Sequence, residues 1–431
     1  MNDIPKCRYH MKEKRNPVKA SNAPTTARPS VSRKHVIVLT SSAAVLYVLI
    51  EMVSGFSAIV TARVVGSPAV AGLGPAIVFG LAGMTSVPAG WLSDRVGRRP
   101  LLSGGFFIGG LGALAAGLSM GTQTVLWLWA AWILTGMGIG ILRLLKAAAA
   151  DLYPPQARTR GIGVVQTGAL LGAYLGMAVA TGRSPQATMR MLADPWFLVA
   201  ILWIMGMIGT WGLLRPDPIQ MAHAWETDQD VPHRSVLPRT GHRRIGAILL
   251  AISVIYGVMV MDMALAGEVL KQMGAGSRTI MIVMAVHFTG MFGPMRWAGG
   301  WATRTPRPRM ALMGAVAMIA ATATMAIVSL TPLTISISLF VVGVGWCIAW
   351  MAGLGELAEA VPPRERGTIM GMADFGSDIV AAIITLFGGV TLAHYHLTGL
   401  VILGVSAGGI AMGTIAWGWP TRRAKISADP I

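Results

Sequence analysis

Twelve apolar segments, most of about 20 residues or more, alternate with short polar connections along most of the chain. They cover residues 36–60, 68–92, 101–119, 124–149, 161–181, 195–214, 245–267, 278–302, 310–330, 333–358, 367–392 and 397–418. A run of about 20 apolar residues is long enough to cross the hydrocarbon core of a bilayer as a helix. The pattern therefore predicts an all-α membrane protein with twelve transmembrane helices.

Three longer polar segments divide the chain. Residues 1–35 are basic and rich in proline; they lack the features of a cleaved signal peptide and are predicted to be a disordered tail. Residues 215–244 combine acidic residues, histidines and prolines, as expected of a solvated linker. This linker separates residues 36–214 from residues 245–418, each with six apolar segments, and residues 419–431 form a second polar tail.

The composition excludes an ordinary soluble protein. Only 12% of the 431 residues are charged, 54% are hydrophobic, and the mean hydropathy is +0.62. The net charge of +17 would suit nucleic acid, but the basic residues occur in short groups between apolar segments and not on one amphipathic element. Basic residues gathered in alternate connections indicate the cytoplasmic face. We therefore predict a monomer in a bacterial inner membrane or a derived internal membrane, with both termini cytoplasmic, lipid as its surroundings and no nucleic-acid partner.

The two sets of six segments are internal repeats. The hexapeptide at 90–95 recurs in weakened form at 300–305, and the octapeptide at 151–158 recurs at 359–366. The offsets of 210 and 208 residues differ by only two. Similarity at one fixed offset indicates a duplicated structural unit, so we expect two related six-helix halves.

The connection between the second and third segments carries a specific motif. Residues 90–99 read Gly-Trp-Leu-Ser-Asp-Arg-Val-Gly-Arg-Arg. This closely resembles the loop between helices 2 and 3 of the major facilitator superfamily of transporters. The resemblance covers residues 36–418 and implies two pseudo-symmetric six-helix halves that rock around a substrate site near the middle of the membrane.

The resemblance also implies a conformational latch that holds the halves together when the cytoplasmic side is closed. In the superfamily, the aspartate of this motif approaches the N-terminus of helix 11, where N–H groups and the helix dipole favour an anion. The arginines pair with an acidic residue at the end of helix 4. The corresponding latch residues here are Gly90, Asp94, Arg95, Gly97, Arg98 and Asp151. In the second repeat Arg304 replaces the aspartate, and Arg304 with Glu359 is the expected remnant.

Ionisable residues inside the apolar segments are the candidates for binding substrate or coupling ions, because a charge in the bilayer costs several kcal/mol without a partner or water. They are Glu51, Arg143, Lys146, Asp262, Glu356, Asp374 and Asp378. The resemblance implies that helices 1, 4, 7 and 10 line a central cavity, so the first five of these residues are expected to face water.

Arg143 and Lys146 lie in one half, and Asp374 and Asp378 lie at similar depth in the other. We expect these residues to pair across the interface in one state and to separate in the other. A static ion pair is the alternative. Two carboxylates one turn apart can also raise each other's pKa, which would suit a proton site.

Glycines in the fifth segment allow two interpretations. Gly163, Gly172 and Gly176 match positions of the superfamily's antiporter motif, but they also have the spacing of closely packed helices. Met177 stands where that motif has proline, and Trp132 where proton-coupled drug antiporters usually have arginine. Close helix packing explains the glycines without the antiporter role.

The sequence points to transport rather than enzymatic chemistry. It contains no Gly-x-x-x-x-Gly-Lys-Ser/Thr loop, no nucleophile with a neighbouring base, and no His or Cys spacing typical of a metal site. We predict no cofactor and no bound metal. The predicted function is secondary active transport of a small solute or ion, coupled to protons. Transport of a metal ion such as iron, drug efflux, and a non-transporting scaffold or sensor remain alternatives.

Overall fold

The computed structural model describes residues 31–181, 188–227 and 239–419. Most of the predicted N-terminal tail, part of the linker and the C-terminal tail lie outside these ranges. Nearly all of the described residues are helical, and no strand occurs among them. Ten of the described helices are long and apolar enough to cross a membrane, which confirms the predicted all-α membrane fold.

The described part of the first half contains ten helical elements of unequal length. They are α1 (Arg33–Val65), η1 (Pro68–Val70), α2 (Leu73–Val96), α3 (Arg98–Thr122), α4 (Val125–Leu142), α5 (Leu145–Asp151), η2 (Pro155–Ala157), α6 (Arg158–Gln166), α7 (Gly168–Thr181) and α8 (Met189–Leu213), the 3₁₀ turns included. The linker contributes α9 (Pro218–Thr227). The second half contains α10 (Arg239–Gln272), α11 (Ser277–Phe292), α12 (Met295–Trp301), α13 (Arg307–Ile327), α14 (Pro332–Ala360) and α15 (Pro363–Gly418).

The count of twelve predicted helices depends on how the irregular helices are divided. Helix α15 contains one non-helical residue, His396 (φ 54°, ψ −156°), between the predicted segments 367–392 and 397–418. Helices α11 and α12 follow one another along the predicted segment 278–302. Dividing α15 at His396 and joining α11 to α12 gives twelve membrane segments, and this count stays a prediction.

Local sequence explains where several helices begin and end. Helix α14 starts with Pro332 and a capping box, in which the Thr331 hydroxyl accepts the Thr334 N–H and the Thr334 hydroxyl accepts the Thr331 N–H. Such a box satisfies N–H groups that a helix start leaves unpaired. Gly97 separates α2 from α3 with φ of 100°, a conformation that side chains disfavour.

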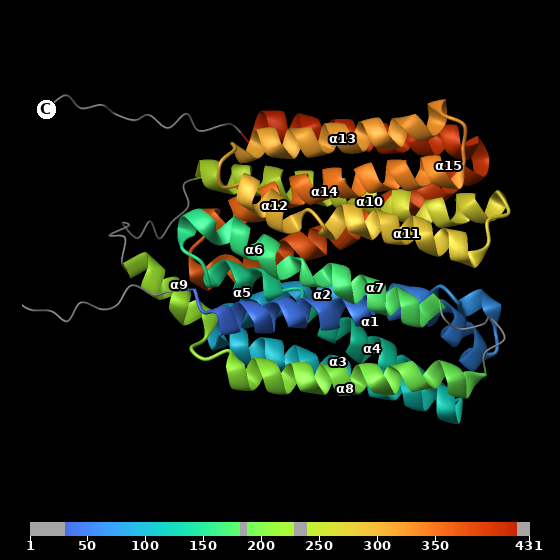
Figure 1. Cartoon of the computed structure of the whole chain (residues 1–431), viewed down its shortest axis with the longest axis horizontal. Helices are drawn as coiled ribbons and strands as arrows, with labels where there is room; N and C mark the ends of the chain where they lie inside the picture. Colours follow the sequence, from blue (N-terminus) through green and yellow to red (C-terminus); the bar gives the residue numbers. More distant parts are fainter. Residues whose placement is uncertain (1–30, 182–187, 228–238, 420–431) are drawn as a thin grey trace, which may run out of the picture.

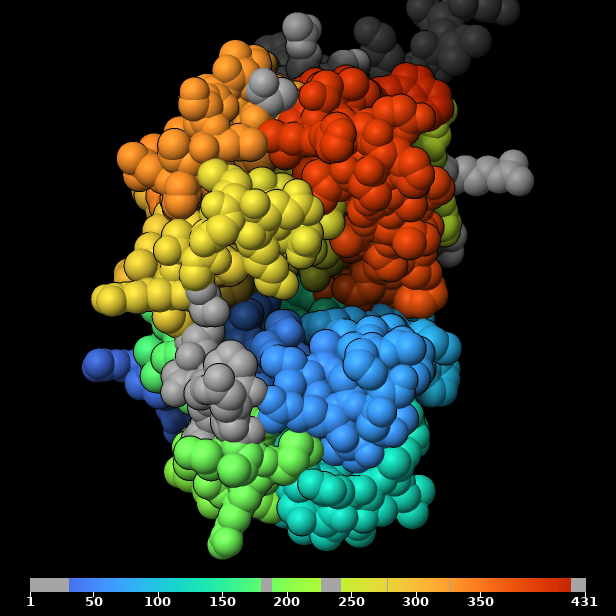
Figure 2. Space-filling model, turned by 90° about the vertical axis from the view of Figure 1, so that its right-hand side faces the viewer, coloured from blue at the N-terminus to red at the C-terminus, as the bar shows by residue number. Residues whose placement is uncertain are grey.

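The helices form two bundles side by side. Figure 1 shows α1–α4, α7 and α8 in the lower bundle and α10–α15 in the upper one. The bundles meet where α2 packs on α15, α6 on α12, and α7 on α11. The end of the molecule that carries α5, α6 and α9 is called the α9 end below. Figure 2 views the opposite end, where the surface is hollowed along the line between the bundles.

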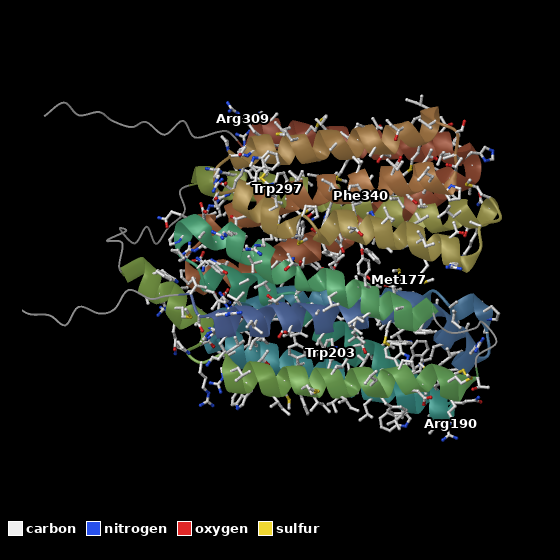
Figure 3. All side chains as sticks on the ribbon, viewed as in Figure 1. Met177, Arg190, Trp203, Trp297, Arg309 and Phe340 are labelled. Atoms are coloured by element: carbon white, nitrogen blue, oxygen red, sulfur yellow. The ribbon has the colours of Figure 1, made fainter. Side chains whose placement is uncertain are left out.

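The outer surface suits a hydrocarbon environment. Large apolar side chains such as Leu126, Ile327 and Trp417 are at least three-quarters exposed. In a bilayer such side chains contact apolar lipid chains, and the backbone polar groups form their hydrogen bonds within the helices. Figure 3 places Arg309 near the α9 end and Arg190 near the opposite end.

Candidate functional site

Asp94 joins the two bundles at the α9 end. Its carboxylate accepts the N–H groups of Gly367 and Thr368 at 2.7 Å each, in the first turns of α15, and also the Thr368 hydroxyl at 2.7 Å. Arg98 Nη1 donates a further bond at 2.7 Å. The start of a helix presents free N–H groups and a positive dipole end, so an aspartate is well suited to this position.

Arg98 extends this contact to Asp151. Arg98 Nε donates to Asp151 Oδ2 at 2.7 Å, and its Nη2 donates to the carbonyl of Pro363 at 2.9 Å. Arg366 of α15 pairs with the other oxygen of Asp151. Arg98, Asp151 and Arg366 are each at most 1% exposed. Asp151 therefore binds one arginine from each half.

Arg366 is a further residue of this junction, and no role was expected for it from the sequence. The repeat at 359–366 could have pointed to it, because Arg366 occupies the position in the second repeat that Arg158 occupies in the first. The pairing itself depends on how α15 packs against α5, which the sequence does not specify.

Gly90 and Gly97 allow the backbone to approach at this junction. A Cβ atom at Gly90 would overlap the carbonyl of Gly367. Beside Gly97, Asp217 of the linker accepts the N–H groups of Arg98 and Arg99 at 3.1 and 2.9 Å. The linker thus fixes the start of α3, which carries Arg98.

Arg95 lies in a different environment from the one expected of a latch residue. Its guanidinium is 3.6 Å from the ring centroid of Trp91, and both side chains are exposed. This stacking directs Arg95 away from the contacts of Asp94 and Asp151. Five of the six predicted latch residues lie at the junction, and Arg95 lies beside it.

The expected remnant in the second repeat is corrected by the structure. Arg304 is exposed, and Arg307 pairs with both Glu356 and Glu359. Arg307 is the first residue of α13, as Arg98 is the first residue of α3. Arg307, and not Arg304, is therefore the structural counterpart of Arg98 in the second half. Glu356 was expected in the cavity, but it pairs with Arg307 and with Arg244 near the α9 end.

Two ion pairs cross between the halves deeper in the bundle. Arg143, directly after α4, pairs with Asp378 of α15. Lys146 of α5 lies 2.5 Å from both carboxylate oxygens of Asp374, one turn away on α15. The side chains of the first pair are 14% and 16% exposed, and those of the second pair are 4% and 7% exposed. The structure thus brings these four predicted residues together.

Aromatic residues surround these pairs. Tyr47 of α1 and Tyr256 of α10 lie close enough to Arg143 and Asp378 to interact with them electrostatically. Both tyrosines are half-buried, and neither hydroxyl is hydrogen-bonded to the residues that the structure describes. A further face is provided by Trp350, whose ring lies 6.0 Å from Lys146 Nζ. The surroundings offer hydroxyl groups and aromatic faces beside the charges.

Glu51 and Asp262 differ in exposure. Glu51 of α1 is half-buried beside Gly176 and has no ion pair within the described ranges. Asp262 of α10 is 2% exposed and accepts the Thr322 hydroxyl at 2.6 Å. The expectation that Asp262 faces water was wrong, because its side chain points into the second half, toward α13.

The predicted glycines of α6 and α7 lie at close helix contacts. A Cβ at Gly163 would overlap the carbonyl of Met295 in α12. At Gly172 and Gly176 a Cβ would approach the carbonyls of Ala44 and Val48 in α1. This geometry is sufficient reason for glycine at all three positions.

Two helical bundles joined by ion pairs at one end and near the centre have the architecture of a membrane transporter. The model of the Major Facilitator Superfamily matches residues 39–385, and the chain belongs to this superfamily.

Individual relatives are distant. The uncharacterized MFS-type transporter YdeG of Bacillus subtilis (strain 168) is 25% identical over 363 residues, which are 81% of each chain. The MFS transporter FucP in its outward conformation has a TM-score of 0.71 at 12% identity, over 90% of this chain and 99% of that one. A bacterial homologue of the iron transporter ferroportin, in an outward-facing state, has a TM-score of 0.68 at 15% identity, over 88% and 98%. At these identities the solved structures indicate the fold alone.

Proposed function

We propose that this transporter moves a small organic solute by alternating access, driven by protons. One observation carries the proposal: Arg143 and Asp378 form an ion pair between the halves, inside the bilayer, and both side chains keep some exposure. A charge within the membrane is costly unless water or a partner compensates for it. A pair that spans the moving interface and is open to water is suited to binding, exchange and release.

The closed α9 end and the hollowed opposite end support an outward-facing state. The α9 end, predicted to be cytoplasmic, is closed by the buried contacts of Asp94, Arg98 and Asp151. The opposite end is hollowed between the halves (Figure 2). The deeper pair, Lys146 with Asp374, is also the less exposed one, as expected if water enters from the hollowed end.

Protons would act on the carboxylates of α15. Protonation of Asp378 or Asp374 removes the charge that holds Arg143 or Lys146, and so weakens the contact between the halves. Because each state of a two-state protein is populated according to such contacts, proton binding would shift the equilibrium toward the other state. The names of solved neighbours include a fucose:proton symporter, and proton coupling here is our inference from the residues.

An organic solute fits the surroundings better than a metal ion. The described part of the chain holds no group of three or more His, Cys, Asp or Glu side chains that could bind a metal. The aromatic residues Tyr47, Tyr256 and Trp350 with an ion pair offer stacking, hydrogen bonds and charge. Drug efflux stays a weaker candidate, because Trp132 and Met177 replace antiporter motif residues. A monomer in a bacterial inner membrane, with both termini cytoplasmic, completes the proposal.

The test compares cells that lack the protein with cells that carry the wild type, Asp378→Asn or Asp94→Asn. Small metabolites and metal content are measured together, and Arg309→Gln, an exposed arginine outside the site, is the control. We expect one organic solute to change with the wild type and the control but with neither Asp variant. A change confined to a metal ion would overturn the solute class. No change in any solute would favour a scaffold.

A further inference from the structure

Five aromatic rings form a continuous wall beside the central ion pairs. The ring centroid of Tyr47 in α1 lies 4.9 Å from that of Phe292 in α11, which lies 6.1 Å from that of Trp346 in α14, both edge to face. Trp346 stacks on Trp350 at 5.6 Å, and Trp350 lies 5.8 Å from Tyr256 of α10. The wall, called the aromatic wall below, therefore runs from the first half to the second.

The two tyrosines are the rings of the aromatic wall that a solute can reach. Phe292, Trp346 and Trp350 are at most 5% exposed. Tyr47 and Tyr256, at the two ends of the wall, are half-buried. The three inner rings thus support the two tyrosines from behind.

Glu51 adds a carboxylate without a compensating cation. Arg143 and Lys146 each pair with a carboxylate of α15, so the charges of these two pairs cancel. Glu51 lies one turn after Tyr47 on the same face of α1, and the two interact electrostatically. Within the described ranges Glu51 forms neither an ion pair nor a hydrogen bond. A cation is the partner that this carboxylate lacks.

Glu51 lies on the side of the ion pairs that faces the hollowed end. Helix α1 runs from the α9 end toward the opposite end (Figure 1), so Glu51 is nearer the hollowed end than Tyr47. A Cβ at Gly176 of α7 would overlap that of Glu51, and Met177, the next residue, lies toward the same end in Figure 3. A solute that enters from the hollowed end (Figure 2) would therefore meet Glu51 before the ion pairs.

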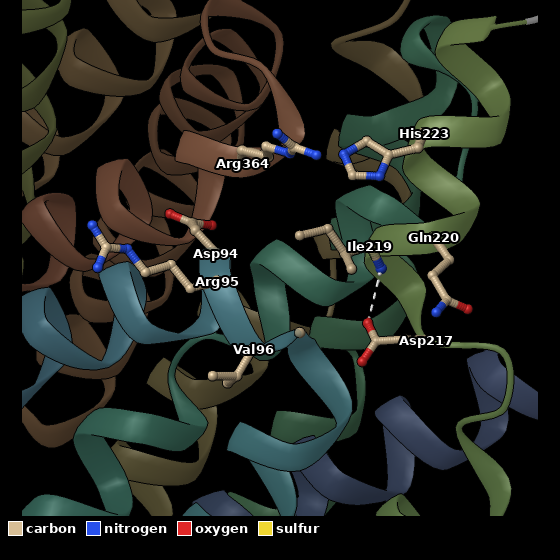
Figure 4. A pocket seen from close by; sticks show the side chains of 9 residues that line it. Asp94, Arg95, Val96, Asp217, Ile219, Gln220, His223 and Arg364 are labelled. Atoms are coloured by element: carbon tan, nitrogen blue, oxygen red, sulfur yellow. Dashed lines mark hydrogen bonds between the residues drawn. The ribbon is translucent and has the colours of Figure 1, made fainter.

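The carboxylates at the α9 end are in a different situation. A pocket of about 250 Å³ at that end is lined by Asp94 and Asp217, among other residues (Figure 4). Asp94 accepts the N–H group of Gly367, and Asp217 accepts that of Ile219, and each has further donors. The protein itself thus compensates both of these charges, which it does not do for Glu51.

We propose that the central site binds a monovalent organic cation, held by Glu51 and by the rings of Tyr47 and Tyr256. The inference rests on the proposed function and narrows its solute class. The face of an aromatic ring attracts ammonium groups, because the ring quadrupole is negative there. A single free carboxylate matches a single positive charge, and the aromatic wall matches an apolar body.

Other classes of organic solute fit this site less well. An organic anion would place a second negative group beside Glu51, while Arg143 and Lys146 are already paired. A sugar needs donors and acceptors together, as amide side chains supply them. Gln166 is the only Asn or Gln within the twelve predicted membrane segments.

The test measures the unfolding temperature of the full-length protein in nanodiscs with phenyltrimethylammonium, because a ligand that binds only the folded state raises it. Benzoate and benzyl alcohol keep the phenyl ring but carry a negative charge or none, and sodium chloride controls for ionic strength. Glu51→Gln removes the charge with little change of shape, and Tyr256→Leu removes an aromatic face. Glu268→Gln makes the same change at an exposed glutamate of α10 and is the control.

We expect phenyltrimethylammonium to raise the unfolding temperature of the wild type and of Glu268→Gln, and the other two compounds to leave it unchanged. In Glu51→Gln the half-maximal concentration should rise about tenfold or more, since the attraction of opposite charges is lost. In Tyr256→Leu it should rise about threefold or more. The proposal is wrong if phenyltrimethylammonium has no effect, if benzoate or benzyl alcohol acts equally, or if Glu51→Gln responds like Glu268→Gln.

Binding and transport can fail separately in these experiments. A neutral or anionic solute that changes in the cells, without any response to phenyltrimethylammonium, would reject the cation class and keep the transport function. A response that depends on Glu51, without any solute change in the cells, would keep the binding site and reject transport.

Discussion

At the scale of single residues, Asp94 shows why a carboxylate is required at the junction of the halves. Its two oxygens accept four bonds, two of them from backbone N–H groups at the start of α15. Each of these partners donates a hydrogen, so a replacement side chain must carry hydrogen-bond acceptors at both of these positions. Aspartate alone among the short side chains meets this condition.

Asp94→Asn should therefore leave the fold intact but weaken the closed α9 end. The amide would direct two hydrogens at groups that are themselves donors, and loss of the charged bonds should destabilise the closed state by about 1–3 kcal/mol. Helix content by circular dichroism should be unchanged, while spin labels at Lys34 and Arg309 should report a longer separation. Equal separations in Asp94→Asn and the wild type would contradict this role.

A second prediction separates the functional ion pair from a static one. Lys146→Ala should leave Asp374 buried without a partner and lower the stability by about 3–5 kcal/mol. Asp374→Ala should have a similar effect, and the double variant should recover most of the loss because no buried charge remains. Unfolding temperatures measure all three proteins.

The same double variant should still fail to transport, since one of the two carboxylates proposed to respond to protons is gone and only the pair of Arg143 with Asp378 remains. Transport is measured as the difference in solute content between cells that carry the variant and cells that lack the protein. A double variant that transports like the wild type would show that Lys146 and Asp374 only support the fold.

At the scale of the helical elements, the glycines determine how closely the helices approach. A Cβ at Gly172 would meet the backbone of Ala44 in α1, whereas Gly104 of α3 has nothing within 4 Å of the added atom. In a helix, alanine is preferred to glycine by about 0.5–1 kcal/mol where space allows. The two positions thus form a matched pair.

Gly172→Ala should lower the unfolding temperature, because α1 and α7 must move apart, and Gly104→Ala should leave it equal or raise it. The same substitution thus gives opposite signs at two sites. Similar effects at both sites would contradict the contact between α1 and α7.

The elements also show what the sequence was able to predict. Apolar length located the membrane segments, and the predicted boundary before residue 397 falls at the irregular residue His396. The motif at 90–99 located Asp94 and Arg98 beside α15. The sequence did not distinguish Arg307 from Arg304, or show that Asp262 faces Thr322. Those outcomes depend on the rotation of each helix, which tertiary packing sets and weakly periodic apolar segments do not reveal.

At the scale of the whole molecule, the two halves touch through a graded set of polar contacts. The contacts of Asp151 at the α9 end are fully buried, Lys146 with Asp374 is nearly so, and Arg143 with Asp378 is the most exposed. A rocking motion of two rigid halves would break such contacts in order of depth. The ion pairs at the centre would then link protonation of Asp374 and Asp378 to the opening and closing of the two ends.

Alternating access controlled by the central ion pairs is tested most directly by measuring distances at both ends of the full-length protein. Spin labels at Lys34 and Arg309 report the α9 end, and labels at Arg190 and Leu333, exposed residues on the two halves, report the opposite end. We expect two populations of label-to-label distances at each end, and the distances at the two ends should change in opposite directions. Neutralising Asp374 and Asp378 together should shift both pairs toward the state with an open α9 end. A single unchanged distance at each end, in the wild type and in the doubly neutralised variant, would contradict the claim that these ion pairs control alternating access.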